Sequence, residues 1–421
     1  MKIIRKTYWQ VWSKSSLEEN WGISRRTKKG RKSMKQLGMY IHIPFCKRKC
    51  KYCDFSSYAQ KDELISEYIT CLKKELKEVG EGIKEQVREG LSMPTIIDTI
   101  YIGGGTPSYI APDYIAQILE VVRQNFQIEK NAEITIEINP GTVDLKKLEV
   151  YKQNGINRCS IGLQAVNDEL LKMLGRIHNK KEFVNTYELA KKAGFENINI
   201  DFMIGLPKQK MEDIEEMLEL IEKLEPTHVS VYSLIVEEQT KLKEELEDGK
   251  LSLPEEVLER KMYWKVKNRL EEQGYEHYEI SNFAKPTYAS KHNLNCWKQK
   301  EYIGFGSSAH SYTDGLRYSN IANIEQYIEN YKKDKQEDNI IFHEKQNEYT
   351  QMQEYMLLGL RKLKGVYGTE FIEKFGQDMF AIFSDQIKKL SKEELIEVNK
   401  DRIYLSNKGL DFANIVWEEF V

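Results

Sequence analysis

Three closely spaced cysteines constrain this chain more than any other feature of its sequence. Cys46, Cys50 and Cys53 stand at spacings of four and three residues in the run Cys-Lys-Arg-Lys-Cys-Lys-Tyr-Cys. A disulfide would leave one of them unpaired, and a zinc site normally takes four protein ligands from two separated pairs. A cubane iron–sulfur cluster needs four ligands, so three thiolates leave one iron open to a small molecule. We therefore favour a [4Fe–4S] cluster over zinc or a chance grouping.

Composition places the chain among soluble globular proteins. It has 421 residues, of which 40% are hydrophobic and 31% charged, and a formal net charge of −3. This length accommodates two domains, and the charge gives no support for nucleic acid as the main partner. No apolar run approaches the roughly 20 residues that cross a bilayer, so we expect membrane contact only through partner proteins. Free thiols, an oxygen-sensitive cluster and the lack of an apolar secretory signal predict a cytoplasmic protein.

The first 33 residues have a composition of their own. Residues 1–33 are basic and aromatic, without a helical or strand period. We expect a disordered extension, or translation that naturally starts at Met34. The alternative is a short arm that covers the active site.

Apolar strand-like runs alternate with amphipathic helical runs about six times along the first two thirds of the chain. We expect strands at 39–43, 95–102, 133–138, 158–163, 197–204 and 228–234, and helices at 62–79, 113–126, 145–154, 167–174, 181–193, 211–224 and 255–273. Apolar strands joined by helices are parallel and buried on both faces. The pattern predicts an α/β fold, either an open doubly wound sheet or a barrel with fewer than the eight units of a closed one.

The distinctive residues follow the ends of these strands. Cys46 comes after the first strand and the run 103–105 of three glycines after the second. Glu137 ends the third strand, Gln164 follows the fourth, and Asp201 lies within the fifth. Chemistry in β/α barrels takes place at the carboxyl ends of the strands. The order of these residues therefore predicts one site at that end of the barrel.

The cysteine spacing, with Tyr52 before the last cysteine, resembles the signature of the radical S-adenosylmethionine (SAM) superfamily. The resemblance implies that SAM binds the open iron through its amino and carboxylate groups, and that the reduced cluster cleaves it to a carbon radical. It also implies a partial, crescent-shaped (β/α)6 barrel, with which the six expected units are compatible.

The residues on either side of the cysteines narrow the resemblance to one branch of the superfamily. Tyr40-Ile-His42-Ile-Pro-Phe-Cys46 and Cys53-Asp-Phe55 are similar to the branch that holds oxygen-independent coproporphyrinogen III dehydrogenase and the heme chaperone HemW family. The dehydrogenases carry a further cysteine where this chain has Phe55, so the sequence favours the heme chaperones. The alternative is a radical enzyme that oxidatively decarboxylates propionate side chains. His42 fits either a contact to cluster or substrate, or an ordinary core histidine.

The same resemblance implies a set of SAM-contacting positions. Arg176 is suited to pair with the SAM carboxylate, and Glu137 and Asp201 to accept hydrogen bonds from its ribose hydroxyls or amino group. Ile235 and His310 align with weaker backbone contacts. The stronger positions are Tyr40, Tyr52, Gly104, Gly105, Thr106, Glu137, Gln164, Arg176 and Asp201.

A second motif implies a heme site. The run His292-Asn-Leu-Asn-Cys296-Trp297 resembles a His-Asn-x-x-Tyr-Trp motif that the HemW family links to heme binding, with Cys296 in place of the tyrosine. Imidazole and thiolate are both standard heme ligands. His292 is therefore the first candidate ligand and Cys296 the second, and heme-accepting proteins are the implied partners. The alternative is that His292 and Trp297 pack a domain junction.

Basic side chains are interleaved with the cysteines at Lys47, Arg48, Lys49 and Lys51. Such a run is usually a solvated face. The alternative is a docking patch for an acidic, flavodoxin-like electron donor, because basic patches accelerate association with acidic partners.

The remaining sequence divides the chain into three parts. We expect the radical SAM barrel at 34–275, a barrel-closing segment with the heme motif at 276–345, and a C-terminal domain at 346–421. The closing segment would begin with one strand at 275–283 and end in a polar linker at 331–347. Helices, a hairpin at 395–405 and a final helix at 408–420 resemble the winged-helix-like C-terminal domain of this family.

Overall fold

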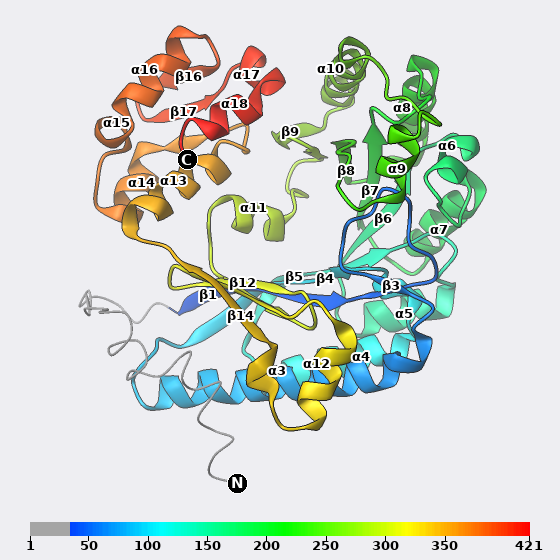
Figure 1. Ribbon diagram of the computed structural model, residues 1–421, viewed down its shortest axis with the longest axis vertical. Coiled ribbons are helices and arrows are strands. Elements are labelled where there is room, and N and C mark those ends of the chain that lie inside the picture. The colour runs from blue at the N-terminus through cyan, green and yellow to red at the C-terminus, as the bar shows by residue number, and fades with distance from the viewer. Residues whose placement is uncertain (1–33) are drawn as a thin grey trace.

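The protein has an α/β fold built around one curved sheet. The computed structural model describes residues 34–421, so the predicted extension at 1–33 lies outside the described residues. Helices cover the outer side of the sheet, and a C-terminal domain stands at the open side of the curve (Figure 1). This is the predicted crescent of a partial barrel. No helix of the described part is long and apolar enough to cross a membrane.

Six parallel strands form the centre of a twelve-stranded sheet, and they follow one another in space as they do in the sequence. Each is joined to the next through at least one helix, as the strand–helix repeat predicts. Because parallel strands all end on the same side, the loops after them meet at one mouth of the crescent. The strands are β1 (Lys35–Ile43), β4 (Thr95–Gly104), β5 (Ile128–Ile138), β6 (Arg158–Gln164), β7 (Asn197–Ile204) and β8 (His228–Ser233).

The outer layer consists of helices packed side by side along the convex face (Figure 1). The first is longer than predicted, because it continues through two glycines. A Cβ on Gly80 would lie 2.6 Å from the Asn125 Cβ, so this glycine lets two helices approach closely. The helices of this layer are α3 (Ile65–Arg88), α4 (Pro112–Asn125), α5 (Leu145–Gln153), α7 (Lys180–Lys192), α8 (Met211–Leu224) and α10 (Glu256–Glu272). Two shorter helices, α6 (Asp168–Met173) and α9 (Lys241–Glu247), lie in the connections before α7 and α10.

The central strands alternate between an apolar outer face and a polar inner face. The outward side chains are fully buried in the main core, among them Ile41, Ile102, Ile136, Ile161, Ile200 and Val229. The strands are therefore buried on both faces, as predicted, but only the outer face is apolar. The inward positions carry Tyr40, Tyr101, Glu137, Ser160, Asp201 and Ser230. The interior of the crescent is thus lined with hydrogen-bonding groups.

The segment after α10 extends the sheet at both edges. The predicted strand at 275–283 is two antiparallel strands, because the chain turns at 280–281, and the predicted linker at 331–347 contains the edge strand β14. Between these edges α11 (Lys291–Trp297) lies on the concave side (Figure 1). The other elements are β9 (Glu276–Glu279), β10 (Asn282–Ala284), β11 (Tyr302–Phe305), β12 (His310–Thr313), β13 (Leu316–Asn320), α12 (Ile324–Lys332) and β14 (Ile340–Lys345).

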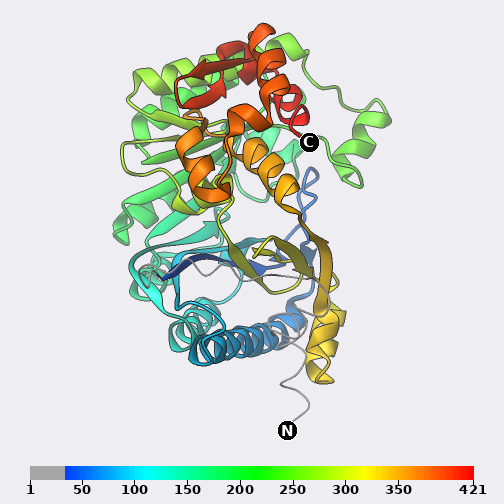
Figure 2. The ribbon, with the colours of Figure 1, turned by 90° about the vertical axis from the view of Figure 1, so that its left-hand side faces the viewer.

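The C-terminal domain has a core of its own, in which Phe371, Phe383 and Ile403 are fully buried. The hairpin forms where it was predicted, and the final helix is interrupted at Phe412. Figure 2 shows this domain at the opposite end of the molecule from α3 and α12. Its elements are α13 (Glu348–Gly359), β15 (Val366–Tyr367), α14 (Gly368–Phe375), α15 (Met379–Ile382), α16 (Ser384–Lys392), β16 (Ile396–Asn399), β17 (Arg402–Leu405), α17 (Asn407–Asp411) and α18 (Ala413–Glu418).

Candidate cluster and cofactor site

The three cysteines lie in the loop that follows β1, at the mouth of the crescent. Cys46 ends β2 (Phe45–Cys46), which pairs in parallel with β3 (Tyr58–Ala59) and closes the loop at its base. Cys46 is buried, Cys50 and Cys53 are half-buried, and all three are free thiols. The two short strands thus hold a compact loop with three reduced sulfur atoms.

The sulfur atoms do not converge on one point. In the described chain, no three His, Cys, Asp or Glu side chains are placed to hold a single metal ion. A cubane does not require such convergence, because each thiolate binds a different iron. The lack of a single-ion site among the described residues is therefore compatible with a cluster.

Two polar groups lie against these thiols. The Thr106 hydroxyl is 3.4 Å from Cys46 Sγ, and Arg176 Nη1 donates to Cys50 Sγ across 3.6 Å. Hydrogen bonds of this kind stabilise the charge of cluster thiolates. Burial raises the pKa of Cys46, and it raises the pKa of Cys53 to about 11. A metal centre must therefore displace protons from these thiols when it binds.

Gly105 is required beside the first cysteine. A Cβ there would lie 3.0 Å from Cys46 Sγ and 2.9 Å from the Phe45 carbonyl oxygen. The Gly105 N–H donates to the carbonyl of Ile43, and the Thr106 N–H donates to the carbonyl of Phe45. The glycine run after β4 thus packs its backbone directly onto the cysteine loop.

Arg176 is anchored by the strand ends next to the cluster loop. Its Nη2 donates to Asn139 Oδ1 at 2.5 Å and to the Gly162 carbonyl at 2.6 Å. Its Nε is buried without a partner among residues 34–421. An unpaired donor beside the thiols is suited to a carboxylate ligand.

Glu137 and Asp201 lie on the inner face beneath the cysteine loop. Glu137 accepts from the Tyr101 hydroxyl at 2.9 Å and from the Gly104 N–H at 3.2 Å. Burial and then the nearby Asp201 raise the pKa of Glu137 to about 7. Asp201 accepts from Ser160 at 3.1 Å and Asn199 at 2.7 Å, and burial raises its pKa as well. Both carboxylates are half-buried, and they suit a ligand that offers hydroxyl or ammonium donors.

Tyr40 and His42 complete this face on β1. The Tyr40 hydroxyl lies 2.9 Å from His42 Nδ1, and His42 Nε2 lies 2.9 Å from the Ser56 carbonyl. Burial lowers the pKa of His42 to about 4, so the ring is neutral. Gly104 has a φ of +116°, and a Cβ there would lie 2.6 Å from the His42 ring. His42 is therefore held by hydrogen bonds at both ring nitrogens and packs against Gly104.

The structure brings most, but not all, of the predicted residues into this interior. Gln164 ends β6 in a left-handed conformation with φ +74°, and Tyr52 lies beside Arg176. Ile235 is 71% exposed, and His310 is exposed and stacks on His343. These last two lie at the rim of the site.

His292 lies deeper on the same inner face. It sits on α11, and its Nδ1 is 2.9 Å from the Thr99 hydroxyl of β4. The Glu133 carboxylate accepts from the backbone N–H groups of Lys291 and His292, which fixes the start of the helix. His292 Nε2 has no hydrogen-bond partner in the described chain, and burial lowers the pKa of the ring to about 4. A neutral imidazole with one nitrogen oriented and the other open is suited to bind a metal.

Cys296 follows one helical turn after His292 on the same face of α11. It is half-buried, and burial raises its pKa to about 11. The sequence did not identify Thr99, Tyr101 or Glu133, although they hold the site residues in place. Their signal was the alternation of polar and apolar residues along β4 and β5.

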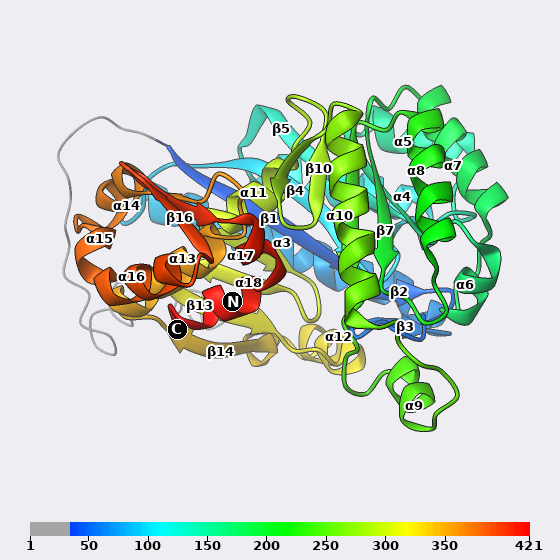
Figure 3. The same ribbon diagram turned by 90° about the horizontal axis from the view of Figure 1, so that it is seen from above.

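The basic run among the cysteines is partly neutralised. Lys51 forms a 2.7 Å salt bridge to Glu245 of α9, and Lys49 donates to the Phe55 carbonyl. Figure 3 shows α9 projecting outward on the side of the molecule where β2 and β3 lie. Lys47 and Arg48 are exposed at the same loop.

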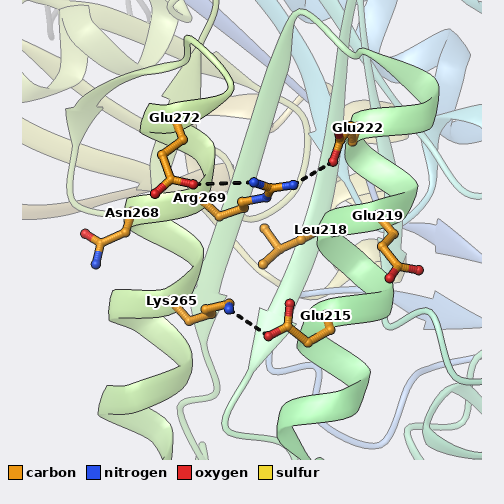
Figure 4. Close-up of a pocket in the computed structure, with 8 residues that line it drawn as sticks. All are labelled: Glu215, Leu218, Glu219, Glu222, Lys265, Asn268, Arg269 and Glu272. Atoms are coloured by element: carbon orange, nitrogen blue, oxygen red, sulfur yellow. Dashed lines mark hydrogen bonds and ion pairs between the residues drawn. The ribbon is translucent and has the colours of Figure 1, made fainter.

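Two grooves on the surface of the described chain lie away from this interior. One of about 380 Å³ lies between α8 and α10 and contains the ion pairs Lys265–Glu215 and Arg269–Glu222 (Figure 4). Another, of about 860 Å³, lies where α6 and α8 begin, outside the barrel mouth. Neither contains a predicted site residue.

Comparison with known proteins decides the family. The Radical SAM superfamily model matches residues 40–221, and the HemN C-terminal domain model matches residues 348–412. The heme chaperone HemW of Bacillus subtilis is 36% identical over 385 residues, which cover 91% of this chain and 98% of the relative. HemW of Lactococcus lactis is 35% identical over 382 residues, which cover 91% and 96%. The chain belongs to the heme chaperone HemW family.

A solved structure gives the same fold. Coproporphyrinogen III oxidase (HemN) from Escherichia coli, a radical SAM enzyme, matches with a TM-score of 0.77 at 22% identity, covering 92% of this HemW-family chain and 90% of HemN. The part matched by the superfamily model runs from β1 into α8 and contains Cys46, Cys50 and Cys53. The radical SAM family implies a [4Fe–4S] cluster and SAM as cofactors, and the donor set in the cysteine loop fits that cluster.

Proposed function

We propose that this protein binds heme and transfers it to acceptor proteins, and that it carries a [4Fe–4S] cluster and SAM. The relatives named heme chaperones span nearly the whole chain, which supports the first part. The single structural observation that carries it is His292, a neutral buried imidazole whose Nδ1 is oriented by Thr99 and whose Nε2 is open. Cys296 is the second candidate for a heme ligand.

The cluster would be held by Cys46, Cys50 and Cys53, with SAM at the open iron. When bound and reduced, the cluster supplies the electron that cleaves SAM. Arg176 would orient the SAM carboxylate, while Glu137 and Asp201 would accept from its hydroxyl and amino groups. The backbone of Gly104, Gly105 and Thr106 would line the bound SAM, with Tyr40, Tyr52 and Gln164 around it. Ile235 and His310 lie at the rim, as backbone contacts would.

The partners follow from this assignment. Exposed Lys47 and Arg48 beside the cluster loop would meet an acidic, flavodoxin-like electron donor, although Lys51 is engaged by Glu245. We place the protein in the cytoplasm, with membrane contact only through heme acceptors. If cluster reduction by flavodoxin proves independent of ionic strength, the docking patch is excluded.

The second candidate function is oxygen-independent coproporphyrinogen III dehydrogenation, which the fold shared with HemN favours. Phe55 stands where the dehydrogenases carry a further cysteine, and it is 65% exposed beside the cluster loop. The presence of the His292 motif also favours the chaperone.

One anaerobic experiment separates the two functions. The reconstituted protein receives coproporphyrinogen III, SAM and a reductant, and in a parallel sample heme is titrated. We expect no decarboxylated product and a saturable Soret band that His292→Ala weakens. Formation of protoporphyrinogen would establish the dehydrogenase and contradict the chaperone assignment.

A further inference from the structure

A stacked arginine joins the heme-motif helix to the C-terminal domain. The guanidinium carbon of Arg361 lies 4.5 Å from the ring centroid of Trp297 on α11 and 4.6 Å from that of Trp417 on α18. Two aromatic rings at such short distances fix the plane of the guanidinium. Arg361 itself follows α13, so three separate parts of the chain meet at this side chain.

In the described chain, the stacked guanidinium has no anion bonded to it directly, although the Glu279 carboxylate acts on it electrostatically. Within residues 34–421, the Arg361 side chain makes no hydrogen bond or salt bridge, and its Nε is buried. The Nε1 of Trp417 is likewise buried without an acceptor. The carboxylate of Glu279 lies nearby, but it accepts from Ser281 and Asn282 and forms no salt bridge to Arg361. A partly buried guanidinium without a direct hydrogen-bond partner is costly, and a bound carboxylate would reduce that cost.

Arg361 lies beside the edge of the sheet that β9 forms, at the junction with the C-terminal domain. The Ile280 N–H donates to the Arg361 carbonyl at 3.1 Å, which places Arg361 alongside β9, the last strand of the sheet. Arg361 is within electrostatic reach of Tyr232 on the inner face of β8, a residue that is 39% exposed. Tyr232 and His292 in turn both lie within reach of Arg158. The inner face of the sheet near Arg361 is thus exposed to solvent at Tyr232.

We propose that Arg361, held flat between Trp297 and Trp417, binds a carboxylate of the porphyrin ligand, that is, a heme propionate. The inference rests on the proposed heme-binding function and adds a recognition residue to it. A planar guanidinium pairs bidentately with a carboxylate. Trp297 follows His292 by five residues, about 7.5 Å along the helix axis and roughly 140° around it. The axial separation is within the span of a porphyrin with its propionate side chains.

The test compares heme with its dimethyl ester, in which both propionate charges are removed. Dissociation constants for the two ligands are measured by Soret titration on the wild-type protein and on Arg361→Gln. The matched control is Arg260→Gln, because Arg260 also lies at the junction with the C-terminal domain but stacks on Tyr263 and pairs with Asp411. Circular dichroism confirms that each variant is folded.

The wild-type protein and Arg260→Gln should bind heme about tenfold or more tightly than the diester, since charged hydrogen bonds have that strength. Arg361→Gln should lose affinity for heme but not for the diester. The ratio of its two dissociation constants should therefore fall close to one. An unchanged ratio in Arg361→Gln would overturn the proposal and make Arg361 a purely structural link between the domains.

Titrations with a metal-free porphyrin distinguish a failure of this inference from a failure of the proposed function. Protoporphyrin IX and its dimethyl ester, titrated by tryptophan quenching, carry the same carboxylates but no iron for His292. If heme shows no His292-dependent Soret band while protoporphyrin still discriminates through Arg361, the heme ligand assignment fails and the carboxylate site stands. If the wild-type protein binds the acid and ester forms equally in both arms, the carboxylate site is refuted.

Discussion

The imidazole Nδ1 of His292 lies 2.9 Å from the Thr99 hydroxyl, so a helix of the closing segment is oriented by a strand of the barrel. Thr99 lies two residues before Tyr101, whose hydroxyl donates to Glu137, and the Tyr101 and His292 rings are 5.2 Å apart. The candidate heme ligand and a candidate SAM contact are thus joined along the inner face of β4.

Removing the Thr99 hydroxyl should weaken heme binding. Thr99→Val keeps the shape of the side chain but leaves His292 Nδ1 without its partner, and losses of this kind weaken metal binding about tenfold. The control is Thr135→Val on the neighbouring strand, since the Thr135 hydroxyl is buried without a partner in the described chain. Soret titration should show a weaker complex for Thr99→Val alone, and equal affinities would contradict the orienting role.

A methyl group on Gly104 should disrupt the cofactor site. Gly104→Ala places a Cβ 2.6 Å from the His42 ring, at a φ of +116° that L-residues rarely adopt. We expect a loss of stability of about 1–3 kcal/mol in urea unfolding and weaker SAM binding. Gly82→Ala in helix α3 meets no atom within 4 Å, so it should be neutral or slightly stabilising. Full SAM affinity in Gly104→Ala would show that the glycine run is only a turn.

Arg176 should raise the reduction potential of the cluster. Its Nη1 donates to Cys50 Sγ, and a hydrogen bond to a cluster thiolate stabilises the more negative, reduced state. Arg176→Met should lower the reduction potential by roughly 60 mV, equivalent to about 1.4 kcal/mol for one electron. An anaerobic redox titration followed by EPR measures this shift. A potential that stays at the wild-type value would remove Arg176 from the cluster environment.

The Glu75 carboxylate should make stability depend on pH. It is buried between α3 and the closing segment, where it accepts from Gly306, Asn320 and Tyr327, and burial raises its pKa to about 7. The folded state then holds a proton that the unfolded state loses near pH 4.5. This contribution is fully present below pH 4.5 and is lost as the pH rises through about 7.

Glu75→Gln provides the measurement. Relative to this variant, the wild-type protein should lose roughly 3 kcal/mol of unfolding free energy between pH 4.5 and 7 and change little above that. Urea unfolding at several pH values measures the difference. A difference that is flat across this range would mean that Glu75 stays ionised in the folded protein.

The cluster motif and the positions of the strand ends could be predicted from the sequence, because both depend on residues that are close together in the chain. Parallel strands end together, so Cys46, Gly104 and Glu137 had to meet at one mouth. The sequence also contains a sign of the polar inner face, the alternation Glu133-Ile-Thr-Ile-Glu137. The mostly apolar composition of the strands obscured this alternation.

Other features depend on contacts between distant segments, which spacing does not reveal. Lys51 pairs with Glu245 across 194 residues, and Arg361 stacks on rings that come from two different domains. The polar stretch before residue 347 reads as a linker because β14 is an edge strand with mostly exposed side chains. Its apolar residues Ile340, Ile341 and Phe342 are consecutive, so the strand lacks the alternation by which to recognise it.

The central claim is that Cys46, Cys50 and Cys53 hold a cubane with one iron open to SAM, in a protein whose heme site is separate. Mössbauer spectroscopy of the anaerobically reconstituted, 57Fe-labelled protein tests it most directly, with and without SAM. We predict one [4Fe–4S] cluster per chain, in which SAM changes the parameters of a single iron, and none in Cys46→Ala. A spectrum without a cluster, or one that SAM leaves unchanged, would contradict the account.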